Sequence, residues 1–166
     1  MKLAIVEVGR VAIDLNDLVG KLNRDQTFFE FRFADPVTNV SEPDLGPYEY
    51  SFRRIASLAA QRREAGDDYI IAVTSVPLEN NYFSEGLSDE RAIVITTHEA
   101  DYLMEIARSP LSKYVAVEIV SNVLSLEYQR VGGEEHKLWH AAPLGCIFDF
   151  AIQKRDMILL LFYLLR

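Results

Sequence analysis

YIIAVTSVPLENNYFSEGLSDERAIVITT, residues 69–97, contains two of the apolar segments that decide the fold class. Residues 69–76 and 91–97 are short and rich in Ile and Val, and a polar stretch with a glycine joins them. Each is therefore a predicted β-strand. Residues 3–8 form a similar apolar segment, and residues 28–33 alternate Phe with Glu and Arg. Together these segments predict a sheet of about four strands.

Apolar residues at helical spacing predict four helices between and after these strands. Residues 14–22 form the first, with the leading aspartate as its N-cap. A long loop follows the second strand, and the second helix begins at Tyr48 and stops before Gly66. The third and fourth helices are expected at residues 97–108 and 113–128. One side of the fourth helix carries the candidate core positions Val117, Val120, Ser121, Leu124 and Tyr128.

The elements follow one another in the order β-α-β-α-β-β-α-α, and an apolar helix is expected at the C-terminus. This alternation predicts an α/β fold with an α+β tendency, built on a mixed, mostly parallel sheet with one antiparallel strand. A length of 166 residues suits one domain, so we expect residues 1–166 to form a single domain.

Composition limits the classes of partner. The chain has a formal net charge of −8, and an acidic domain repels phosphate backbones, so no nucleic-acid partner is expected. The longest apolar run, residues 157–165, is far shorter than the roughly 20 residues of a membrane-spanning helix, so no membrane partner is expected either. The chain has 1 cysteine, which fits a reducing compartment, and we expect a cytoplasmic location.

No complete catalytic motif is present. The sequence has neither a glycine-rich phosphate loop nor a Gly-x-Ser-x-Gly elbow. Cys146 lies among apolar residues, where cysteines are usually inert. His136 and His140 are four residues apart, the spacing that places two imidazoles on one helical face, but Pro143 follows them closely.

A further histidine stands beside acidic residues. His98 and Glu99 lie close to Asp101, at the start of the predicted third helix. Thr96 and Glu99 have the spacing of a capping box, which explains the acidic residues without a ligand. We therefore name one candidate cluster, which folding would have to bring together: His98, His136, His140 and Cys146.

The order and spacing of these elements resemble those of metzincin-type zinc peptidases, especially the compact archaemetzincins. In that comparison residues 69–97 correspond to a strand pair ahead of the active-site helix. SKYVAVEIVSNVLSLEYQ, residues 112–129, corresponds to that helix, and GCIFDF, residues 145–150, lies where a methionine-containing turn would fall. The resemblance covers roughly residues 69–150 and implies a metallopeptidase-like fold.

The zinc motif of that family is His-Glu-x-x-His-x-x-Gly-x-x-His, in which three histidines hold the metal and the glutamate is the general base. On this helix Val117 and Ser121 take the positions of the first two histidines. Leu124 takes that of the glycine and Glu127 that of the third histidine. Only Glu118 matches, as the general base, and it is the one candidate catalytic residue. The resemblance thus implies a pseudopeptidase that lacks zinc ligands, and no cofactor is expected.

The C-terminal run supplies a hint of function, because it is apolar on every side and must be covered inside the domain or by another chain. The expected partner is another protein chain or a second copy, contacting Met157, Leu160, Leu161, Phe162 and Leu164. The leading hypothesis is therefore a non-catalytic binding or assembly domain, which the resemblance identifies more narrowly as a metzincin-like pseudopeptidase.

Two alternatives remain open. One is a hydrolase or metal-dependent enzyme that uses His136, His140 and Glu118, with zinc as its metal. The other is a small-ligand-binding α/β domain. By analogy with open α/β sheets, its pocket would lie at the carboxyl ends of the strands, near Gly9, Thr74 and Thr96.

Overall fold

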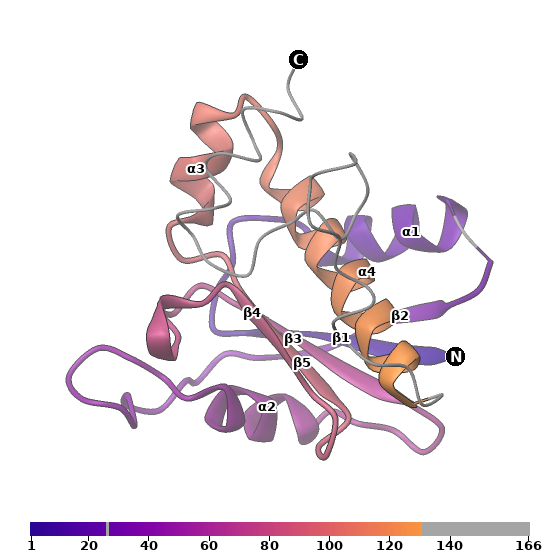
Figure 1. Cartoon of the computed structure of the whole chain (residues 1–166), viewed down its shortest axis with the longest axis horizontal. Helices are drawn as coiled ribbons and strands as arrows, with labels where there is room; N and C mark the ends of the chain where they lie inside the picture. Colours follow the sequence, from indigo (N-terminus) through magenta and orange to yellow (C-terminus); the bar gives the residue numbers. More distant parts are fainter. Residues whose placement is uncertain (26, 131–166) are drawn as a thin grey trace.

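A computed structural model describes residues 1–25 and 27–130 of the chain (Figure 1). Five strands within these residues form one sheet in the order β2-β1-β3-β5-β4. Three pairs of neighbours are parallel, and β4 runs antiparallel to β5 at the edge. The strands are β1 (Lys2–Val8), β2 (Glu30–Val37), β3 (Tyr69–Thr74), β4 (Ser84–Leu87) and β5 (Ala92–Thr96).

The predicted fold class is confirmed, with one strand more than expected. The α/β order and the mostly parallel sheet with one antiparallel strand are both present. The additional strand is β4, which lies in the polar stretch that was expected to be a connection. Ser84, Glu85 and Gly86 lack the alternating apolar residues that predict a strand. They belong to an edge strand and are only partly buried, so this position in the sheet does not require apolar side chains.

Helices cover both faces of the sheet (Figure 1). On one face, α1 (Leu15–Asp25), α3 (Ala100–Ile106) and α4 (Leu111–Arg130) pack over one apolar core. On the other face, α2 (Phe52–Ala60) covers a second core. A short 3-10 turn, η1 (Glu79–Asn81), precedes β4. None of the helices in residues 1–25 and 27–130 combines the length and the apolar character needed to cross a bilayer.

Local capping and periodicity explain α1 and α2. The Asp14 carboxylate accepts a hydrogen bond from the Asp17 backbone N–H at 2.9 Å, as an N-cap does. The α2 helix begins after Ser51, whose hydroxyl accepts from the Arg54 N–H, and therefore starts later than Tyr48. Its buried residues are Phe52, Ile55, Ala56 and Ala59, which recur at helical spacing.

The expected long loop after the second strand begins later than predicted. The β2 strand continues through Pro36 to Val37. Proline cannot donate to a sheet ladder, but β2 is an edge strand and its outer side needs no donor.

The predicted core face of the α4 helix is wrong. Val117, Val120, Ser121 and Leu124 are only half-buried. The buried side of α4 instead carries Tyr114, Val115, Glu118, Ile119, Val123 and Leu126. Since apolar residues occur all around this helix, their spacing alone did not indicate which side faces the sheet.

Candidate functional site

Glu118 lies in a buried polar cluster between α4 and β4. Its side chain is 7% exposed, and its carboxylate accepts a hydrogen bond from the Ser84 hydroxyl at 2.5 Å. The Asn122 amide donates to the Ser84 hydroxyl at 3.0 Å and to the Glu118 backbone carbonyl at 2.9 Å. The cluster therefore joins the fourth helix to the edge strand through side chains that are themselves hydrogen-bonded.

The surroundings of Glu118 favour its neutral form. Burial raises the pKa of Glu118 to about 7, and the hydrogen bond from Ser84 opposes this only in part. Tyr114 lies one turn earlier and donates to the Thr96 carbonyl at 2.9 Å. Its ring packs edge-on against Phe83, with centroids 5.6 Å apart. Burial, and then the nearby Glu118, raise the pKa of the Tyr114 phenol as well.

The residues at the metzincin ligand positions do not fit a catalytic zinc ion. Val117 has no lone pair to offer, and a serine hydroxyl such as that of Ser121 is a poor zinc ligand. Glu118, the matching general base, points into the cluster with Ser84. Within residues 1–25 and 27–130, no three or more His, Cys, Asp or Glu side chains are grouped so that they could hold a metal.

The candidate cluster of histidines and the cysteine is described only in part. His98 is placed two residues after the end of β5, whereas His136, His140 and Cys146 lie outside the described residues. The C-terminal apolar run from Met157 lies outside them too. His98 lines a pocket at the end of β5, and Glu118 is not among the residues that line it.

A pocket of about 360 Å³ opens at the carboxyl ends of the three central parallel strands. Arg10 follows β1, Ser75 follows β3, and His98 follows β5. The Ser75 hydroxyl donates to the Arg10 carbonyl at 2.8 Å and so joins two of these loops. We call this the carboxyl-end pocket; its wall includes Arg10, Ser75, Thr97, His98, Asp101 and Tyr102.

The position of this pocket agrees with the expectation for a small-ligand domain, one or two residues beyond Gly9, Thr74 and Thr96. Sequence reasoning did not identify Arg10, Ser75 or Tyr102 as lining residues. Their positions, shortly after a strand or in the helix that follows it, could have identified them. Ligands of open α/β sheets bind at the carboxyl ends of strands.

The loop after β5 does not form the predicted capping box. Thr96 donates to the Val76 carbonyl at 2.6 Å and accepts from the His98 N–H at 3.0 Å. Glu99 has a left-handed backbone, with φ 61°, and makes no side-chain cap bond. The α3 helix therefore begins at Ala100, three residues later than expected, because Thr96 hydrogen-bonds to the neighbouring β3 loop.

The charges in the carboxyl-end pocket are not neutralised within the described part of the chain. There, the Arg10 guanidinium has no ion pair or hydrogen bond, and the Asp101 carboxylate accepts only from the Tyr102 N–H at 2.8 Å. Both residues are exposed. The wall of this pocket therefore contains one guanidinium, that of Arg10, and two carboxylates, those of Asp101 and Glu99, and neither Arg10 nor Asp101 forms an ion pair with a described residue.

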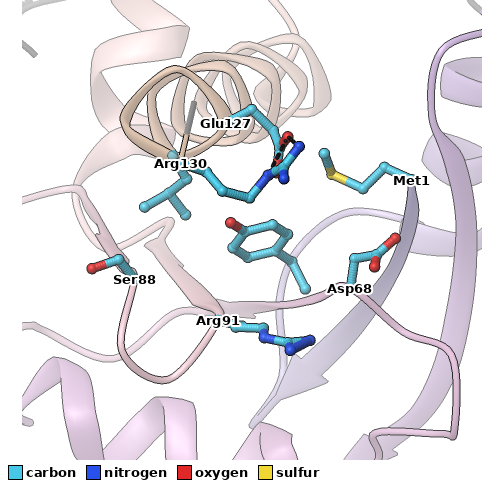
Figure 2. A pocket seen from close by; sticks show the side chains of 8 residues that line it. Met1, Asp68, Ser88, Arg91, Glu127 and Arg130 are labelled. Carbon is cyan, nitrogen blue, oxygen red and sulfur yellow. Dashed lines mark hydrogen bonds and ion pairs between the residues drawn. The ribbon is translucent and has the colours of Figure 1, made fainter. Parts of the chain in front are cut away.

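A second pocket, of about 740 Å³, lies at the opposite end of the sheet, beside the last turn of α4. Figure 2 shows Glu127 and Arg130 on one side of it, with Met1, Asp68, Ser88 and Arg91 around the rest. Arg130 binds Glu127 at 2.8 to 3.0 Å, and Asp68 accepts from the Lys2 N–H at 2.8 Å. One ion pair therefore lies in the wall of this pocket, beside Arg91 and Asp68, which form no ion pair with any described residue.

Comparison with known proteins supports the fold. No protein-family model matches the sequence, and no curated protein matches it. Among solved structures, the crystal structure of archaemetzincin from Methanopyrus kandleri is similar, with a TM-score of 0.63 and 16% sequence identity. The match covers 95% of this chain and 85% of that one. The predicted metzincin-like resemblance is thereby confirmed at the level of the fold, and the low identity carries it no further.

Proposed function

We propose that this chain is a non-catalytic binding or assembly domain on a metallopeptidase-like fold, a pseudopeptidase in chemical terms. The resemblance to metzincins carries the proposal: where residues 112–129 are matched to the active-site helix of that family, Val117 and Ser121 take the positions of zinc-binding histidines. Neither side chain can take the place of an imidazole at zinc.

The environment of Glu118 supports the same conclusion. A metallopeptidase base must reach a water molecule that a metal has activated. Glu118 is instead buried and hydrogen-bonded to Ser84, so its carboxylate holds a helix to a strand. The residue that matches the family's general base thus has a structural partner in this chain.

Metal content tests the proposal directly. Purified full-length protein is incubated with zinc, freed of unbound metal and measured by mass spectrometry, alongside Glu118→Gln. We expect no stoichiometric zinc and no peptide hydrolysis in either protein. Zinc bound by the wild type together with hydrolysis that Glu118→Gln abolishes would contradict the proposal. Zinc lost on His136→Ala or His140→Ala would instead favour a metal-dependent enzyme built on those histidines.

The proposed partner surface is the apolar run at residues 157–165. We propose that it binds a second copy of this chain, because a run of Leu and Phe side chains favours association when it is not covered by its own domain. Light scattering after size-exclusion chromatography should then give twice the chain mass of 18.9 kDa. A mass of one chain would contradict the homodimer, and Leu161→Glu should shift a true dimer toward that mass.

Small-ligand binding is a second candidate function. The observation that favours it is the carboxyl-end pocket, which lies where open α/β sheets bind ligands and is lined by Arg10 and Asp101, two side chains that form no ion pair with any described residue. This function is compatible with the first, since binding at this pocket requires neither zinc nor Glu118.

A further inference from the structure

We propose that the carboxyl-end pocket binds a free amino acid with an apolar side chain. The inference rests on the second function proposed above, small-ligand binding, and names the class of ligand. Three features of the pocket support this ligand class: the position of the pocket in the sheet, its separated charges and its apolar wall.

The pocket lies at the point where the chain reverses its direction across the sheet. From β1 the chain passes through α1 to β2 on one side, whereas β3 leads on to β5 on the other side. The loops that follow β1 and β3 therefore diverge to opposite faces and leave a crevice between them. Arg10 and Ser75 stand at the start of these two loops and are joined by the hydrogen bond from Ser75 to the Arg10 carbonyl.

The charges of the pocket suit a zwitterion. The Arg10 guanidinium presents a planar set of donors that matches a carboxylate. Asp101 presents a carboxylate that suits an ammonium group. No ion pair joins these two side chains, both of which the structure describes. Each charge is therefore available to a ligand that carries both a carboxylate and an ammonium group, as an amino acid does on its α-carbon.

The rest of the wall suits a small apolar side chain. Tyr102 is 64% exposed, and together with Ala12 and the half-buried Leu111 it forms the apolar part of the pocket. The volume of about 360 Å³ is at the small end of ligand pockets and admits an amino acid. The wall thus has a cationic, an anionic and an apolar part. They correspond to the carboxylate, the ammonium group and the apolar side chain of the ligand.

Isothermal titration of the full-length protein with L-leucine and L-phenylalanine tests the proposal. N-acetyl-leucine and leucinamide are matched controls, because the first lacks the ammonium group and the second lacks the carboxylate. We expect binding of at least one free amino acid and a loss of about tenfold or more in affinity for each derivative.

Two variants assign the binding to the pocket. Arg10→Gln and Asp101→Asn should each weaken binding about tenfold, because each leaves one charged end of the ligand unpaired. Arg24→Gln on α1 and Glu105→Gln on α3 change exposed charges that do not line the pocket, and they should leave the affinity unchanged.

The outcomes separate the ligand class from the function on which it rests. If the derivatives bind as tightly as the free amino acids, and Arg10→Gln or Asp101→Asn still weakens binding, the zwitterion is wrong but the pocket remains a small-ligand site. Binding that neither substitution changes would overturn the assignment to this pocket. If no probe binds at millimolar concentration, the amino-acid ligand is overturned.

Discussion

Glu118 occupies the one position of α4 that matches the zinc motif of metzincins, yet its carboxyl group bonds to Ser84 on the neighbouring edge strand. A glutamate in that sequence context suggests a catalytic base. Its burial and its hydrogen bond connect α4 to β4, so its proton affinity should affect folding stability.

The stability of the protein should therefore depend on Glu118 at near-neutral pH. The pKa of Glu118 rises from 4.5 to about 7 in the folded state, so the folded protein holds this proton more tightly than the unfolded chain. The stabilisation is complete below about pH 4.5 and is lost as the pH rises to about 7. Glu118→Gln should remove this loss and be more stable above pH 7, by up to about 3 kcal/mol.

Denaturant unfolding at about pH 5 and about pH 8 measures the effect of Glu118. Glutamine keeps an acceptor for the Ser84 hydroxyl, so the comparison isolates the charge. Glu105→Gln, an exposed carboxyl on α3, is the control and should follow the wild type. Equal pH dependence in Glu118→Gln and the wild type would contradict the prediction.

At the scale of elements, the contact between β4 and α4 depends on the absence of a side chain at Gly86. A Cβ atom there would lie 3.1 Å from the Cγ and both Cδ atoms of Leu126 on α4. Leu126 is buried and also lines the pocket beside the last turn of α4, so a Cβ atom at position 86 would force its side chain to shift by a few tenths of an ångström. Close packing of this edge strand under a helix therefore favours glycine at position 86.

Gly86→Val should destabilise the protein by about 1–3 kcal/mol, because its extra methyl groups overpack the contact with Leu126. Gly20→Ala is the matched control within α1, where a new Cβ meets only the Arg24 side chain at 3.8 Å. It should stabilise the helix by about 0.5–1 kcal/mol. Denaturant unfolding measures both. Leu126→Ala should cost less in the Gly86→Val background than alone, and equal costs would show that the two sites do not interact.

At the scale of the whole molecule, two apolar cores share one sheet. The β3 strand belongs to both, since Ile70 contributes to the core under α2 and Ile71 to the core under α1, α3 and α4. Both side chains are fully buried. Damage to either core should therefore weaken the same cooperative unit.

Ile70→Ala and Ile71→Ala should each destabilise the protein by about 2–5 kcal/mol, because each leaves a cavity beside the central strands. In both variants thermal unfolding followed by near-UV and far-UV circular dichroism should give one coincident transition at a lower midpoint. Two separate transitions, with Ile70→Ala lowering one and Ile71→Ala the other, would show that the layers unfold independently.

Much of the fold followed from local pattern. Short apolar segments predicted β1, β3 and β5, and helical spacing predicted α2, whose buried face carries Phe52, Ile55, Ala56 and Ala59. These predictions succeeded because β3 and β5 are apolar and buried on both faces, whereas α2 has one distinct apolar face, and each pattern is typical of one conformation. The order of the elements also predicted the metallopeptidase-like fold, since the connections between neighbouring elements restrict the topology.

The remaining features depend on residues that are distant in the sequence. Glu118 and Ser84 are 34 positions apart, and the orientation of α4 brings them together. Arg10 and Asp101 line one pocket only because β1 and β5 end at the same edge of the sheet. The amino-acid sequence by itself determined which segments become strands and helices, through the spacing of apolar side chains. The tertiary structure decided which polar groups are buried, paired or left open to a ligand, because these properties depend on neighbours that only folding supplies.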